Sequence, residues 1–84
     1  MKQVKVYTTS YCGYCHRAKR LLEARGVPFE EVDVEGDDAQ RAWLVNTTGQ
    51  RTVPQIFFGE ESIGGYRELS NLDRAGQLKG RLAD

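Results

Sequence analysis

The sequence predicts a small α/β domain in which helices cover both faces of a four-stranded mixed sheet. Strand-like and helix-like segments alternate along the 84 residues, glycine and proline mark most boundaries, and the last two strand-like segments are close enough to form a hairpin. A helix between two strands implies a parallel pair with a right-handed crossover, and the hairpin adds antiparallel strands. The expected order is β-α-β-α-β-β-α, within a single domain spanning residues 1–84.

The first half of the chain predicts a strand, a helix and a second strand, over residues 3–8, 13–25 and 28–34. Val4 and Val6 alternate with a lysine, which is typical of a half-buried strand. The helical segment places apolar residues on one side and charged residues on the other. Gly26 and Pro28 follow it and prevent its continuation.

The second half predicts a helix over residues 37–47, two strands of a hairpin over 53–58 and 61–63, and a last helix that Gly76 breaks. Acidic residues suit the start of the first of these helices, in which Ala39, Ala42 and Trp43 have helix-like spacing. We expect Trp43 to lie in the core or on a half-buried helix face. The last helix and the short turn after Gly76 are defined by their apolar residues, Leu69, Leu72, Ala75, Leu78 and Leu82.

The charge balance excludes several classes of partner. Twelve basic residues match twelve acidic ones and the pI is about 6.6, so no net field favours nucleic acid or anionic lipid. The N-terminal residues alternate and lack the apolar run of a secretory signal, and no segment approaches the length of a membrane span. We therefore expect a monomeric cytoplasmic protein that binds neither nucleic acid nor membrane.

The two cysteines, Cys12 and Cys15, form a C-x-x-C pair at the start of the first predicted helix. A free thiol has a pKa of about 8.5, and placement at a helix N-terminus or in C-x-x-C lowers it to roughly 3.5–7.5. Cys12, which comes first, is the candidate nucleophile. Cys15 lies one helical turn further on the same face, where it can form a disulfide with Cys12 and act as the resolving thiol.

Two other roles for the pair are disfavoured. A closed zinc site needs four ligands, whereas the chain offers Cys12, Cys15 and the neighbouring His16. A structural disulfide between the cysteines would close a very short loop and contribute little stability through chain entropy. Redox chemistry is the favoured interpretation, because C-x-x-C beside a β-α-β pattern is typical of redox proteins.

Three segments, YTTSYCGYC, TVPQIFF and IGGYREL, resemble in order and spacing the small dithiol glutaredoxins, here with a C-G-Y-C active site. The resemblance covers nearly the whole chain. It implies a thioredoxin-like fold, a cis Val53–Pro54 bond, and no tightly bound cofactor, with glutathione as the reducing co-substrate. It also implies reduction of protein–glutathione mixed disulfides and protein disulfides, with ribonucleotide reductase among the candidate partners.

The same resemblance implies a set of glutathione-binding residues. Thr52, Val53 and Pro54 would align the peptide part, Gly65, Tyr66 and Arg67 would hold the γ-glutamyl carboxylate, Arg41 would meet the glycine carboxylate, and Tyr14 would border the groove. From the residues alone, Pro54 is consistent with the first residue of an edge strand, and the two adjacent glycines slightly favour an ordinary turn.

The chain departs from the family pattern at two positions, which leaves other functions open. Many relatives have a lysine at Thr9 and an acidic residue at Arg67, so a flavoprotein or another low-molecular-weight thiol is an alternative reductant. Arg67→Asp is expected to lower the Michaelis constant for glutathione. Gly13, where some members have proline, also allows a second alternative, a dimer that binds a [2Fe–2S] cluster with glutathione as a ligand.

Overall fold

The computed structural model describes residues 1–10 and 12–83 and has the predicted element order, with one further short helix. The elements are β1 (Val4–Thr8), α1 (Gly13–Ala24), β2 (Glu30–Asp33), α2 (Asp38–Thr48), β3 (Gln55–Phe58), β4 (Glu61–Gly64), α3 (Tyr66–Arg74) and α4 (Leu78–Leu82). The sheet order is β2-β1-β3-β4. β1 pairs in parallel with β2 and antiparallel with β3, and β3 pairs antiparallel with β4, so the predicted mixed sheet is confirmed.

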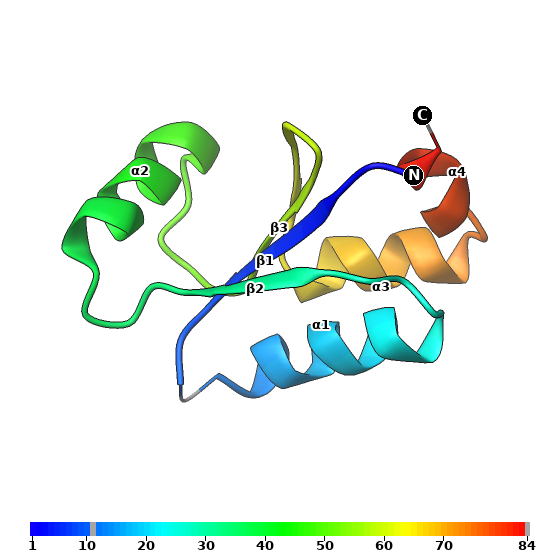
Figure 1. Cartoon of the computed structure of the whole chain (residues 1–84), viewed down its shortest axis with the longest axis horizontal. Coiled ribbons are helices and arrows are strands. Elements are labelled where there is room, and N and C mark those ends of the chain that lie inside the picture. The colour runs from blue at the N-terminus through cyan, green and yellow to red at the C-terminus, as the bar shows by residue number, and fades with distance from the viewer. Residues whose placement is uncertain (11, 84) are drawn as a thin grey trace.

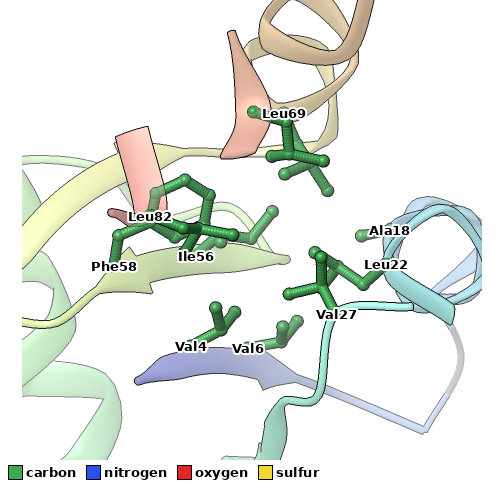
Figure 2. Close-up of a cluster of buried hydrophobic side chains, with 10 residues drawn as sticks. Val4, Val6, Ala18, Leu22, Val27, Ile56, Phe58, Leu69 and Leu82 are labelled. Atoms are coloured by element: carbon green, nitrogen blue, oxygen red, sulfur yellow. The ribbon is translucent and has the colours of Figure 1, made fainter. Parts of the chain in front are cut away.

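Helices α1 and α3 lie side by side on one face of the sheet, and α2 lies on the other side (Figure 1). Alternate residues of β1 and β3 point toward α1 and α3, as Figure 2 shows for Val4, Val6, Ile56 and Phe58. They meet Leu22 of α1 and Leu69 of α3 in the main core. The main cluster therefore fixes α1 and α3 against the same two strands.

Two strands begin two residues later than the sequence predicts. β3 starts at Gln55 instead of residue 53, because Pro54 has no N–H to donate to a ladder. β2 starts at Glu30 instead of residue 28. The backbone before it still belongs to the end of α1, since the Val27 N–H donates to Leu22 O at 2.9 Å.

Helix α2 buries a different residue from those that suggested its apolar side. Leu44 is its buried residue, whereas Ala39 and Ala42 are exposed. Trp43 is 45% exposed and thus more exposed than expected for the core or a half-buried helix face, although its ring lies 5.7 Å from those of Tyr7 and Phe57. In the described part of the chain, no helix is long and apolar enough to cross a membrane.

Candidate active site

Cys12 is the N-cap residue of α1, and its sulfur lies between a donor and an acceptor. The backbone is extended at this residue, and the Cys15 N–H donates to Cys12 Sγ at 3.1 Å. On the other side, the Cys12 thiol donates to Val53 O at 3.5 Å. The N–H can bond the sulfur as thiol or thiolate, whereas the carbonyl can bond only the thiol. Ionisation of Cys12 therefore releases the Val53 carbonyl, which can then pair with a bound peptide.

Cys15 lies one turn inside α1 and is 2% exposed. Burial, and next the hydrogen bond with Cys12, raise the pKa of the Cys15 thiol to about 12. The backbone amide of Thr9 and the charge of Lys19 act in the opposite direction but do not outweigh the burial. At neutral pH Cys15 is a thiol, so of the two sulfurs Cys12 is the one placed to attack first.

A loop before β3 forms the wall opposite Cys12, and its Val53–Pro54 bond is cis, as the family resemblance implies. The buried side chain of Gln55 supports this loop, because its Nε2 donates to Thr52 O at 2.8 Å. Gly65 approaches from the start of α3. A Cβ at Gly65 would lie 3.4 Å from Pro54 O, so a residue without a side chain allows this close approach.

A groove of about 500 Å³ runs beside the loop. Tyr14 and Tyr66 form part of its lining, with ring centroids 6.0 Å apart, and the Arg17 guanidinium lies 5.4 Å from the Tyr14 centroid. Seven of the eight residues predicted to bind glutathione line this groove: Tyr14, Thr52, Val53, Pro54, Gly65, Tyr66 and Arg67. Cys12 reaches the same wall through its bond to Val53 O.

Arg41, the eighth predicted residue, lies beside the groove and not in its lining. It lines a smaller hollow that shares Gln50, Thr52 and Val53 with the groove. Its Nη2 donates to Arg51 O at 3.4 Å. The proposed contact between Arg41 and the glycine carboxylate of glutathione stays a prediction.

Glu68 changes the expected carboxylate site at the start of α3. Its Oε1 accepts the Gly65 N–H at 2.8 Å, so that amide is already occupied. The N–H groups of Tyr66 and Arg67 lie in the first helical turn, which offers them no acceptor within the helix. Any carboxylate bound there would rely on these two amides.

Three residues near the site were not included in the predicted set: Arg17, Gln50 and Glu68. The signal for Glu68 is present in the sequence, because an acidic residue three positions after a helix cap commonly bonds back to the cap N–H. Gln50 follows the end of α2 without a comparable signal. In residues 1–10 and 12–83, no three His, Cys, Asp or Glu side chains are grouped to hold a metal ion.

Comparison with known proteins supports the interpretation of the cysteine pair. The family model for glutaredoxin matches residues 4–63. The chain is 46% identical over 83 residues to a glutaredoxin of Pseudomonas aeruginosa, with 99% of each chain covered. It is 45% identical over 78 residues to glutaredoxin 3 of Escherichia coli K12, with 93% of this chain and 94% of the relative covered.

A solved structure, the buckwheat glutaredoxin–glutathione complex, has a TM-score of 0.90 and 36% identity to the chain. The match covers 96% of this chain and 76% of the buckwheat chain. The thioredoxin-like fold predicted from the resemblance is thus confirmed, and the free thiols of Cys12 and Cys15 are adjacent at the expected place. The chain belongs to the glutaredoxin family of thiol–disulfide oxidoreductases.

Proposed function

We propose that this protein uses glutathione to reduce protein–glutathione mixed disulfides and protein disulfides, with Cys12 as nucleophile and Cys15 as resolving thiol. The observation that carries the proposal is the position of the Cys12 sulfur, which lies at the N-terminus of α1 within 3.5 Å of Val53 O, at the wall of the groove. Attack by a sulfur there is directed at a disulfide whose peptide part lies along Val53.

For a mixed disulfide, the Cys12 thiolate attacks the glutathione sulfur. A bond forms between Cys12 Sγ and that sulfur, the original disulfide breaks, and the protein thiolate leaves and takes up a proton. A second glutathione, as thiolate, then attacks the glutathione sulfur on Cys12. Oxidised glutathione leaves and the Cys12 thiolate is restored. Cys15 takes no part in this monothiol route.

For a protein disulfide, Cys12 forms a mixed disulfide with the substrate and Cys15 displaces it. The new bond joins Cys12 and Cys15, and the substrate leaves with both of its sulfurs reduced. Two glutathione molecules then reduce the Cys12–Cys15 disulfide. Only this dithiol route needs Cys15, which agrees with the burial of that thiol and with its high pKa of about 12.

Glutathione suits the groove by charge and by shape. It is an extended tripeptide with two carboxylates. Arg41 lines the adjoining hollow, and the N–H groups of Tyr66 and Arg67 at the start of α3 have no acceptor within the helix. The Val53 backbone offers peptide pairing. The relative from buckwheat was solved as a glutathione complex, which is the reason to prefer this thiol over others.

Steady-state reduction of a peptide–glutathione mixed disulfide tests the proposal, with glutathione, cysteine and thioredoxin reductase each supplied as reductant. Glutathione should support the highest kcat/KM. The Cys12→Ser variant should lose activity and Cys15→Ser should keep it. Turnover with the flavoprotein or with cysteine, but not with glutathione, would replace glutathione as the electron donor while leaving the chemistry of the thiols in place.

We also propose a cytoplasmic location, because regeneration of the two thiols needs a reducing compartment. Fractionation of cells expressing the tagged chain checks this. Recovery in an oxidising compartment with Cys12 and Cys15 joined would contradict it.

A further inference from the structure

A short network of hydrogen bonds lies beside Cys15 on the side of the sheet that faces α1. Thr8 Oγ1 donates to Glu31 Oε2 at 2.8 Å, and Lys19 Nζ donates to the same oxygen at 3.0 Å. Glu31 pairs with Val6 across the β1–β2 ladder, so it points to the same face as Val6. One carboxylate oxygen therefore joins β1, β2 and α1.

The network restrains the charge of Lys19. The Lys19 side chain is 22% exposed, and Thr8, which supports Glu31 from the other side, is 1% exposed. A lysine on a helix surface usually samples several positions in solvent. Here the ammonium group is bound to a carboxylate that is itself anchored to a buried hydroxyl, so its average position is defined.

That position is close to the resolving thiol in the helix. Lys19 follows Cys15 by four residues in α1, a spacing that puts two side chains on neighbouring turns of one face. The backbone amide of Thr9 and, to a smaller extent, the positive charge of Lys19 lower the pKa of Cys15, against the larger effect of burial. Thr9 directly follows Thr8, so both favourable groups belong to the network or adjoin it.

The charge of Lys19 and the Thr9 amide matter most in the resolving step, in which Cys15 reacts. In the reduced protein, the hydrogen bond with Cys12 and the charge of Cys12 both oppose ionisation of Cys15. Once Cys12 is bonded to a substrate sulfur, it has neither a proton to share nor a charge. Of these causes, burial then still raises the pKa of Cys15, while the Thr9 amide and the charge of Lys19 still lower it.

We propose that Lys19, held in place by Glu31 and Thr8, supplies the charge that lets Cys15 resolve the mixed disulfide. In that step Cys15 loses its proton, its sulfur attacks Cys12 Sγ, and the bond from Cys12 to the substrate breaks. The substrate thiolate leaves with the electron pair and takes up a proton, so no other reactant is needed. Glu31 and Thr8 are positioning residues. The inference rests on the proposed roles of the two cysteines, but not on the identity of the reductant.

Other charged or titratable groups lie around the network and bear on its pH dependence. Asp33 and Glu35, at the end of β2, accept the backbone N–H groups of Glu35 and Ser10 and stay in place in the variants below. The loop of Thr52, Val53 and Pro54 adds no charge. The hydrogen bonds from Lys19 and Thr8 lower the pKa of Glu31 and the charge of His16 adds to them, so His16 also faces the network, whereas Cys12 acts on Cys15.

The test compares the two routes in the full chain. Single-turnover reduction of insulin, stopped with acid and read by mass spectrometry, measures formation of the Cys12–Cys15 disulfide. Reduction of a peptide–glutathione mixed disulfide measures the monothiol route. Lys19→Met should slow the first reaction severalfold, because it removes a charge that favours the Cys15 thiolate. It should change the second less than twofold and move the pH profile of the first to higher pH.

Matched variants separate charge from structure. Lys19→Arg keeps the charge and should retain most of the rate of insulin reduction. Arg20→Met, at the next and exposed position of α1, should leave both routes unchanged. His16→Asn should leave the pH profile of insulin reduction in place. Glu31→Ala should slow insulin reduction a few-fold, because Lys19 loses its anchor. Thermal unfolding monitored by circular dichroism verifies that each variant is folded.

Three results would overturn the inference. An equal loss in both routes for Lys19→Met would place its effect on Cys12 or on the fold, and no loss in either would mean that its charge does not act on Cys15. Faster insulin reduction by Glu31→Ala would show that Glu31 withholds the charge. Failure of the proposed function looks different, because a wild-type protein that does not use glutathione still forms the Cys12–Cys15 disulfide with insulin.

Discussion

Helices α1 and α3 lie side by side and pack into the same core, yet their first turns are closed by different chemistry (Figure 1). At α1 the cap is the sulfur of Cys12, which accepts the Cys15 N–H, and the first turn has no acidic residue. At α3 the cap is the carboxylate of Glu68, which accepts the Gly65 N–H. A carboxylate beside Cys12 would oppose its thiolate. The third residue of α3, Glu68, therefore closes its helix cap, whereas the third residue of α1 is Cys15, the resolving thiol.

The largest expected effect is a difference in alkylation between the two thiols of α1. At pH 7.5, iodoacetamide should modify Cys12 at least about a hundredfold faster than Cys15, because the thiolate is the reactive form and Cys15 is buried with a pKa of about 12. The rate at Cys15 should still be rising with pH between 9 and 11. Peptide mapping by mass spectrometry measures both rates.

Denaturant provides the control for this experiment, since both thiols should react at similar rates in the unfolded chain. Similar rates in the folded protein would mean that Cys15 is accessible and ionised, and the contrast between attacking and resolving thiols would then fail.

Truncation of a core side chain in the middle of α1 or of α3 should lower stability by a similar amount, in contrast to the different chemistry of their first turns. Leu22 of α1 and Leu69 of α3 are fully buried in the cluster of Figure 2. Leu22→Ala and Leu69→Ala should each lower the free energy of unfolding by about 2–5 kcal/mol, through lost burial and a residual cavity. Urea denaturation measures both. A loss below 1 kcal/mol for one of them would mean that its helix is not part of the shared core.

Glycines next to the two first turns provide a matched pair of smaller changes. A Cβ at Gly64, where φ is +114°, would lie 2.7 Å from Glu68 Oε1, whereas a Cβ at Gly13 would meet nothing within 4 Å. Gly64→Ala should therefore cost about 1–3 kcal/mol of stability. Gly13→Ala should gain about 0.5 kcal/mol. Thermal unfolding of the two variants decides, and a neutral Gly64→Ala would mean that Glu68 moves aside at no cost.

The main features of the fold were predictable because they depend on local patterns. The alternation of Val4 and Val6, the stop at Gly26 and the hairpin turn each act within a few residues. The C-x-x-C spacing likewise placed both sulfurs on one turn. Leu44 was missed as the buried residue of α2 because the choice among several apolar residues depends on where the sheet lies, which local spacing does not specify.

The missed parts of the site depend on contacts between distant residues. Thr8 and Lys19 lie 23 and 12 positions from Glu31, and they meet only because β1, β2 and α1 are packed together. The bond from Glu68 to the Gly65 N–H spans only three residues and was also not predicted. Family resemblance supplied the cis Val53–Pro54 bond, which no pattern of periodicity would predict.

A charge change at Arg67 tests how the charge of the groove near the start of α3 affects KM for glutathione. Arg67→Asp should lower KM for glutathione about threefold, with kcat nearly unchanged, because an acid there can meet the ammonium group of the γ-glutamyl part and exposed pairs contribute about 0.2–1 kcal/mol. Arg20→Asp makes the same charge change on α1 outside the groove and should leave KM unchanged. A raised KM for Arg67→Asp would instead identify Arg67 as the partner of a carboxylate.

The smallest expected effect concerns the far ends of α1 and α3, which are joined by an ion pair. Arg25 Nε and Nη2 donate to the two carboxylate oxygens of Asp73 at 2.6 and 2.9 Å, and this pairing lowers the pKa of Asp73. A lowered pKa contributes stability at pH values above the pKa that Asp has in the unfolded chain, about 3.9. That contribution is lost as the pH falls through the lower pKa of the folded state.

Arg25→Gln should therefore reduce stability slightly at pH 7 and have a shallower loss of stability than the wild type between pH 5 and pH 2. Urea denaturation across this range measures the difference, and the Lys19–Glu31 pair, present in both proteins, cancels in the comparison. Both ends of the pair are near solvent, so 0.5 M salt should remove most of the difference at pH 7. Parallel curves for the two proteins would mean that the core alone, without this ion pair, holds α1 and α3 together.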